Sequence, residues 1–204
     1  MSEASSKEFY FTIEKESVAE FKDRGSRFLA YAFPVADAVE FKKRLKEIKE
    51  EHPKAVHHCF AYRIDAEGNN FRSSDDGEPS GSAGRPILGQ IDSRELTGIA
   101  IIVVRYFGGV LLGVPGLIHA YKTAASFALQ SVPIIKKPVL INYTLQFDYT
   151  IMNEVMRIIK KYECLVFQQE MQLFCHMKIG IPKSVGELCL SQLNNMKGIE
   201  LSQA

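Results

Sequence analysis

The sequence predicts two α+β domains joined by a short linker. Its 204 residues suffice for one large domain or two small ones. Strand-like and helix-like patterns alternate along the chain, and residues 131–138 place two prolines and two lysines between such patterns. Beyond this segment the elements follow the order βαββαβ, which is typical of ferredoxin-like domains. We therefore place the domains at residues 1–132 and 138–204.

The first domain opens with extended segments and a helix. Residues 9–13 predict a strand, and residues 18–33 predict a hairpin that turns near residues 23–26. A helix is expected from about residue 36, with Asp37 near its start, because apolar residues then recur at helical spacing. Lysines and an arginine cover its other face. We interpret that face as a solvated surface, with a basic contact face as the alternative.

Residues 57–64 predict the next strand, in which alternate side chains lie on opposite faces. His57 and Cys59 then share one face at roughly 7 Å, and His58 lies on the other. That separation is too long for a good hydrogen bond, so a catalytic Cys–His pair is disfavoured. We favour a half-buried histidine, His57 or His58, that hydrogen-bonds the following loop and lines a site there.

Turn residues dominate the segment 73–84, SSDDGEPSGSAG, which disfavours both a strand and a helix interior. Its three carboxylates, Asp75, Asp76 and Glu78, leave three interpretations open. They cap the next helix and brace the loop, or they form a polar ligand or partner site, or they bind a divalent cation. Because the spacing is not that of an EF-hand, cation binding is the least favoured of the three interpretations. The arginines available for bracing are Arg72, Arg85 and Arg105.

A helix is expected to begin at residues 82–88, where its first turn tolerates Pro86. Its free N–H groups make this end a candidate anion site. A strand buried on both faces follows at 99–104, then a second glycine-rich loop. Gly108 and Gly113 have the spacing of a P-loop. Since Val-Pro follows in place of Lys-Ser/Thr, an ordinary ATPase is disfavoured.

The motifs DDGEPSGSAGRPIL and VVRYFGGVLLG…GLIHAY resemble the signature of the IMPACT/YigZ family. The resemblance covers about two-thirds of the chain, and the remainder resembles the C-terminal domain of bacterial members. It implies an N-terminal IMPACT domain, a two-layer βαβ sandwich with a left-handed crossover, related to a translation-factor domain and a ribosomal-protein domain. It also implies that the C-terminal domain is like the last domain of elongation factor G.

This chain departs from the family pattern after Gly113. Pro115 removes one backbone donor, and His119 stands where the family has a permanent cation. If the family binds phosphate at this loop, the resemblance implies weaker binding here. Arg85, Arg105 and Lys122 are the cations that could compensate.

We interpret the chain as a non-catalytic binding or regulatory protein linked to translation, which contacts RNA, the ribosome or a protein of translation control. The alternative is an enzyme, a hydrolase or phosphoryl-handling protein, that uses the three carboxylates and a histidine. Eukaryotic relatives restrain a translation-inhibiting kinase, but this chain begins almost at once with the IMPACT domain, so we do not expect that partner to transfer. The candidate binding residues are His57, His58, Asp75, Asp76, Gly77, Glu78, Ser80, Gly81, Ser82, Gly84, Arg85, Arg105, Tyr106, Gly108, Gly109, Gly113, His119 and Lys122.

Composition bounds these interpretations. Basic and acidic residues nearly cancel, 25 against 24, so a nucleic-acid site must be a local patch. The four cysteines are widely spaced without a C-x-x-C pair, which argues against structural zinc and against a disulfide scaffold. No apolar run approaches about 18 residues. We expect a soluble cytoplasmic protein with no cofactor, no metal and no membrane partner, in an oligomeric state that the sequence leaves open.

Overall fold

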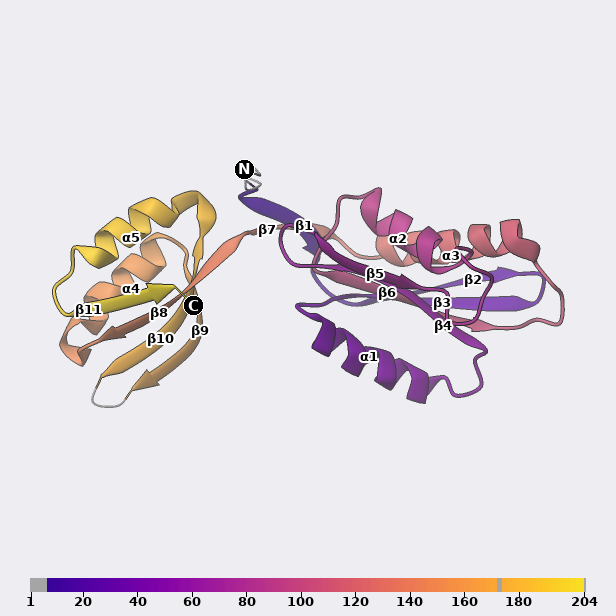
Figure 1. Ribbon diagram of the computed structural model, residues 1–204, viewed down its shortest axis with the longest axis horizontal. Coiled ribbons are helices and arrows are strands. Elements are labelled where there is room, and N and C mark those ends of the chain that lie inside the picture. Colours follow the sequence, from indigo (N-terminus) through magenta and orange to yellow (C-terminus); the bar gives the residue numbers. More distant parts are fainter. Residues whose placement is uncertain (1–6, 172–173, 204) are drawn as a thin grey trace. The chain divides into compact units, whose positions relative to one another are not determined.

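Figure 1 shows the computed structural model, in which residues 7–171 and 174–203 are described. The chain divides into two compact units. One spans Tyr10–Lys137, and the other runs from Pro138 onward and includes the described residues before Tyr10. Each unit combines an antiparallel sheet with helices, so the predicted α+β class is confirmed.

A five-stranded sheet forms the centre of the first unit. Its order is β2-β3-β6-β4-β5, and each neighbouring pair is antiparallel. β6 lies in the middle and is buried along almost its whole length, as its apolar run predicts. The prediction that residues 73–84 contain no strand is wrong at one end, because Ser73 and Ser74 complete β5. The strands are β2 (Ser17–Asp23), β3 (Ser26–Pro34), β4 (His57–Ile64), β5 (Asn70–Ser74) and β6 (Ile99–Tyr106).

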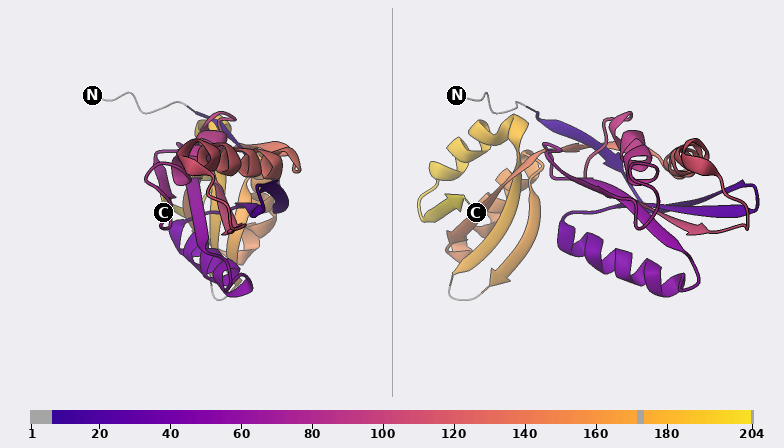
Figure 2. Two further views of the ribbon diagram at one scale, coloured as in Figure 1. Left: turned by 90° about the vertical axis from the view of Figure 1, so that its right-hand side faces the viewer. Right: turned by 45° about the vertical axis from the view of Figure 1, so that its right-hand side comes forward.

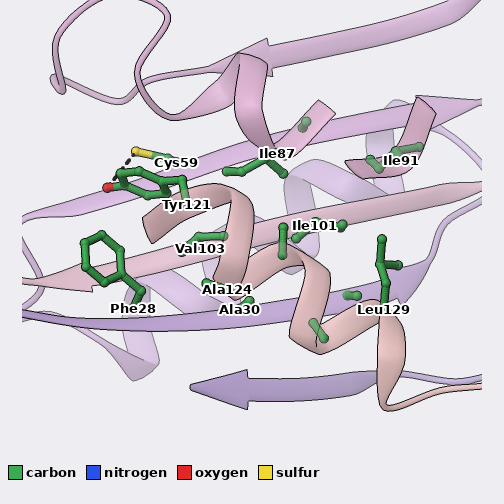
Figure 3. Close-up of a cluster of buried hydrophobic side chains, with 14 of the residues drawn as sticks. Phe28, Ala30, Cys59, Ile87, Ile91, Ile101, Val103, Tyr121, Ala124 and Leu129 are labelled. Carbon is green, nitrogen blue, oxygen red and sulfur yellow. Dashed lines mark hydrogen bonds between the residues drawn. The ribbon is translucent and has the colours of Figure 1, made fainter. Parts of the chain in front are cut away.

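Helices cover both faces of this sheet, as Figure 1 and the right-hand view of Figure 2 show. α1 (Ala38–Glu51) packs on one face, where Phe41 contacts the rings of Phe60 and Tyr62. α2 (Gly84–Asp92) and α3 (Gly113–Gln130) pack on the other (Figure 3). The unit therefore has three layers, which corrects the predicted two-layer sandwich. The reason is that both faces of the sheet are apolar.

The start of α1 follows from local sequence, and the strands on either side of α1 complete a βαβ unit. Asp37 caps α1 as predicted, because its Oδ1 accepts hydrogen bonds from the N–H groups of Val39 and Glu40, each at 2.8 Å. β3 and β4 both pair antiparallel with β6, so they run parallel to each other with α1 between them. This is the βαβ unit that the family resemblance implied.

The expected linker at residues 131–138 is partly a strand. β7 (Ile134–Pro138) pairs with β1 (Phe9–Ile13) in a two-stranded sheet. Its sequence IIKKP does not alternate, and its partner lies more than a hundred residues earlier. Local sequence therefore carries no signal for this pairing, and the linker prediction is corrected here.

The second unit has the predicted ferredoxin-like arrangement. Its strand order is β11-β8-β10-β9, with all neighbours antiparallel, and its two longer helices supply apolar side chains to one core. Two short 3₁₀ helices, Tyr149–Ile151 and Lys183–Val185, precede α4 and α5. The elements are β8 (Leu140–Phe147), α4 (Met152–Lys161), β9 (Leu165–Met171), β10 (Cys175–Pro182), α5 (Gly186–Asn194) and β11 (Ile199–Gln203).

Candidate functional site

Asp75 closes the acidic loop onto the start of α2. Its carboxylate accepts hydrogen bonds from the backbone N–H groups of Gly81 at 2.8 Å, Ala83 at 3.0 Å and Gly84 at 2.8 Å. Burial disfavours its ionised form, but these backbone donors outweigh burial and lower the pKa of Asp75. The residue at the N-cap position, Ala83, cannot cap the helix itself. Asp75 therefore occupies the helix end that the sequence offered as an anion site, and that prediction is corrected.

The lowered pKa of Asp75 predicts how stability depends on pH. A carboxyl with a lower pKa in the folded state stabilises the protein above its unfolded value of 3.8, and this contribution is lost as pH falls through the folded pKa. Asp75→Asn is expected to lose about 1–2 kcal/mol of unfolding free energy near neutral pH. Urea titrations should show this difference from wild type shrinking below about pH 4. A difference that is independent of pH would contradict the assignment.

Asp76 clamps the same loop to β4. Its backbone is in the left-handed region, with a φ of 43°. Its Oδ2 accepts a hydrogen bond from the N–H of His58 at 2.7 Å, and its carbonyl oxygen accepts one from Nδ1 of His57 at 2.7 Å. Lys49 of α1 lies 3.6 Å from the other carboxylate oxygen. The predicted half-buried histidine that bonds the loop is His57.

Glu78 turns inward instead of facing solvent. Its Oε1 accepts hydrogen bonds from Nη1 of Arg105 at 2.6 Å and from the hydroxyl of Tyr121 at 2.7 Å. Nε2 of His57 lies 3.9 Å from the same oxygen. Arg105 is only 5% exposed, so it cannot reach an external partner directly. We therefore reassign Arg105 from a contact residue to one that positions the loop.

Tyr121 and Cys59 extend this buried polar cluster. The Sγ of Cys59 lies 2.9 Å from the carbonyl oxygen of Asp75 and 3.3 Å from the hydroxyl of Tyr121 (Figure 3). Burial is the largest of the causes that raise the pKa of Cys59 and the pKa of Tyr121. Both groups stay protonated at neutral pH, so neither provides a nucleophile. Sequence reasoning missed Tyr121, although a tyrosine among the buried alanines of α3 needs a polar partner.

The three carboxylates are therefore engaged within the chain. One binds backbone N–H groups, one binds β4, and one binds a buried arginine and tyrosine. Within residues 7–171 and 174–203, no group of three or more His, Cys, Asp or Glu side chains is placed to hold a metal ion. Of the three interpretations of the acidic loop, this geometry matches capping and bracing.

The second glycine-rich loop rests on the β2–β3 turn. A Cβ on Gly108 would lie 1.9 Å from the carbonyl carbon of Gly25, so only glycine permits this approach. Gly109 and Gly113 have positive φ values of 86° and 68°. Arg24 in the turn donates a hydrogen bond to the carbonyl oxygen of Leu112 at 3.0 Å. The hairpin thereby fixes the path of the loop into α3.

Pro115 lies in the first turn of α3, which begins at Gly113. The N–H groups of a first helical turn have no partner inside the helix, so proline is tolerated there without a lost helical hydrogen bond. The loop exposes apolar side chains, with Leu111 at 82% and Phe107 at 49%. It presents a surface that is apolar as well as glycine-rich.

The predicted site residues divide between the interior and the surface. The structure brings His57, the acidic loop and Arg105 together, whereas the hydroxyl of Tyr106 hydrogen-bonds Nδ1 of His52 at 2.9 Å on the α1 side. His119 is exposed and packs edge-on against Phe21 at 5.8 Å between ring centroids. His58 is buried, and burial followed by the nearby Lys49 lowers its pKa. The exposed candidates are Gly77, Ser80, Arg85, Gly109, Gly113, His119 and Lys122, and the buried ones are His58, Glu78, Ser82, Gly84 and Arg105.

No helix in the described part of the chain is long and apolar enough to cross a lipid bilayer.

The sequence model of the Impact N-terminal domain matches residues 24–129, just over half of the chain. An IMPACT family member from Haemophilus influenzae is 32% identical over 186 residues, which cover 90% of each protein. The IMPACT family member YigZ from Escherichia coli is 35% identical over 149 residues, 72% of this chain and 73% of that protein.

A solved structure supports the same relationship across both units. The crystal structure of a hypothetical protein matches with a TM-score of 0.75 and 27% identity, and it covers 97% of this chain and 98% of its own. The family suggested by the two glycine-rich motifs is thus confirmed by matches that extend well beyond those motifs. The chain belongs to the IMPACT family.

Proposed function

We propose that this protein is a non-catalytic regulator of translation that binds RNA or the ribosome through the surface around its two glycine-rich loops. The observation that carries the non-catalytic part is that all three loop carboxylates are engaged within the chain. The link to translation is what membership of the IMPACT family implies. The engaged carboxylates make the loop a rigid support for the residues that it exposes.

Exposed cations on the helical layer support an RNA partner. Arg85 of α2 and Lys122 of α3 are exposed, and the sequence of α3 contains no acidic residue to oppose them. Phe107 adds an exposed aromatic ring on which an unpaired base can stack. Exposed positive charge together with an exposed aromatic ring is a common combination for binding single-stranded nucleic acid.

The enzymatic alternative has less support. A hydrolase of this kind needs a free carboxylate or an activated nucleophile near a base. In the described cluster, Glu78 binds Arg105 and Tyr121, and the raised pKa of Cys59 keeps its thiol protonated. A phosphoryl-handling role would in addition require a cation site, which the cluster does not offer.

The test is binding of purified ribosomes and of a single-stranded RNA across a salt series. We expect Lys122→Ala and Arg85→Ala each to weaken binding several-fold and to reduce the slope of log affinity against log salt by about 0.7 per lost phosphate contact. Lys42→Ala is the matched control. It removes the same charge from an exposed position on α1, which covers the opposite face of the sheet.

Two outcomes would overturn the proposal. One is the absence of any RNA or ribosome binding by the wild-type protein at low salt. The other is binding that Lys42→Ala weakens as much as Lys122→Ala does, because the interaction would then reflect net charge and not this surface.

A further inference from the structure

Two cysteines that are far apart in sequence meet inside the second unit. The Sγ atoms of Cys164 and Cys189 are 3.6 Å apart. Cys164 lies between α4 and β9, and Cys189 lies in α5. Twenty-five residues separate them, so their spacing in the sequence gave no indication of a pair.

The local fold accounts for this meeting. Glu163 adopts a left-handed φ of 53° and ends α4, and the N–H of Cys164 then bonds the carbonyl oxygen of Ile159 at 2.9 Å. This tight turn directs Cys164 into the core, where it joins the fully buried Cys189. Cys164 is 9% exposed and Cys189 is fully buried, so the access that the pair has to solvent lies on the Cys164 side.

We propose that Cys164 and Cys189 form an oxidisable dithiol, which a peroxide converts into an intramolecular disulfide. This inference is independent of the proposed function, because both cysteines lie in the second unit, away from the two glycine-rich loops in sequence. The site is one of covalent modification, and its co-reactant is a two-electron oxidant of the peroxide class.

The chemistry needs both sulfur atoms. The hydrogen bond from the Cys164 thiol lowers the pKa of Cys189, which favours a thiolate there. The Cys189 thiolate attacks one peroxide oxygen, the O–O bond breaks, hydroxide leaves, and a sulfenic acid forms. That hydroxide takes up the proton released by Cys189 and becomes the first water. The Sγ of Cys164 then attacks the Cys189 sulfur, the S–O bond breaks, and the departing hydroxide takes the proton of the Cys164 thiol and leaves as the second water. Two thiols lose two electrons and two protons, and one hydrogen peroxide becomes two waters.

The other cysteines lack such an arrangement. The sulfur of Cys59 has a carbonyl and a phenol as its neighbours. Cys175 lies in the same core as the pair, but no hydrogen bond joins its sulfur to another cysteine in the described residues. Cys175 therefore provides an internal comparison in the same unit, about as buried as Cys189.

The experiment is intact-mass analysis of the full-length protein after treatment with hydrogen peroxide. We expect a product lighter by two hydrogen atoms, which returns to the original mass after addition of dithiothreitol. Proteolysis without reductant should yield one linked peptide pair that contains Cys164 and Cys189. This measurement uses the wild-type protein and does not depend on the folding of any variant.

Variants then test the assignment. Cys164→Ser and Cys189→Ser are each expected to abolish the lighter product, while Cys175→Ser forms it as wild type does. An unchanged mass, addition of oxygen without a cross-link, or a linked pair that contains Cys59 or Cys175 would each overturn the proposal.

Discussion

Glu78→Ala is expected to destabilise the protein by about 3–5 kcal/mol. The substitution leaves Arg105 buried without its carboxylate and removes the acceptor of the Tyr121 hydroxyl. Only 3% of the Glu78 side chain and 7% of the Arg105 side chain is exposed, so water cannot replace the lost partner. The free energy of unfolding, measured by urea titration with circular dichroism, gives the loss directly.

A surface ion pair provides the control for this prediction. Glu50 faces Lys46 at 3.8 Å with both side chains largely exposed, and Glu50→Ala should change stability by no more than about 0.5 kcal/mol. Adding Arg105→Met to Glu78→Ala should recover part of the loss, because the buried charge is then removed as well. A loss below about 1 kcal/mol in Glu78→Ala would contradict the buried arrangement.

The second large effect is expected at Gly108→Ala, with a loss of about 3 kcal/mol. The new Cβ would lie 1.9 Å from the carbonyl carbon of Gly25 and 2.1 Å from the nitrogen of Ser26. These are backbone atoms, so no side-chain rotation relieves the clash. The β2–β3 turn and the second loop must separate, which thermal unfolding should report as a lowered midpoint.

Gly89→Ala is the matched control for this substitution. Gly89 lies in α2, and a Cβ there would meet no atom within 4 Å. Since alanine favours the helix, we expect this change to raise stability by about 0.5–1 kcal/mol. Equal effects of the two substitutions would show that Gly108 is not held against the turn.

The sequence predicted most of the fold because its signals are local. Apolar periodicity located the helices, a continuous apolar run located β6, and Asp37 marked the start of α1. The two failures differ in cause. β7 forms because β1, which is distant in sequence, lies beside it. The two-layer sandwich came from the family resemblance, whereas β4 and β6 contribute apolar side chains to helices on both faces of the sheet.

The candidate site shows the same division. The sequence of residues 75–78 showed the cluster of carboxylates. The sequence of β4 offered His57 or His58 as the histidine that bonds the loop. The sequence did not show where each carboxylate points, because the partners of Glu78 lie far along the chain. Arg105 comes 27 residues after it and Tyr121 comes 43 residues after it. Counting charges in a loop identifies available groups, but tertiary contacts decide whether they face solvent.

The position of Asp75 has a consequence for competition at the start of α2. A carboxylate tethered nine residues before the helix acts as an intramolecular ligand, with an effective concentration on the order of millimolar or higher. A free phosphate at lower concentration cannot displace it from the same N–H groups. The helix end thus carries its own competitive inhibitor, and dissolved anions gain access only if the loop opens.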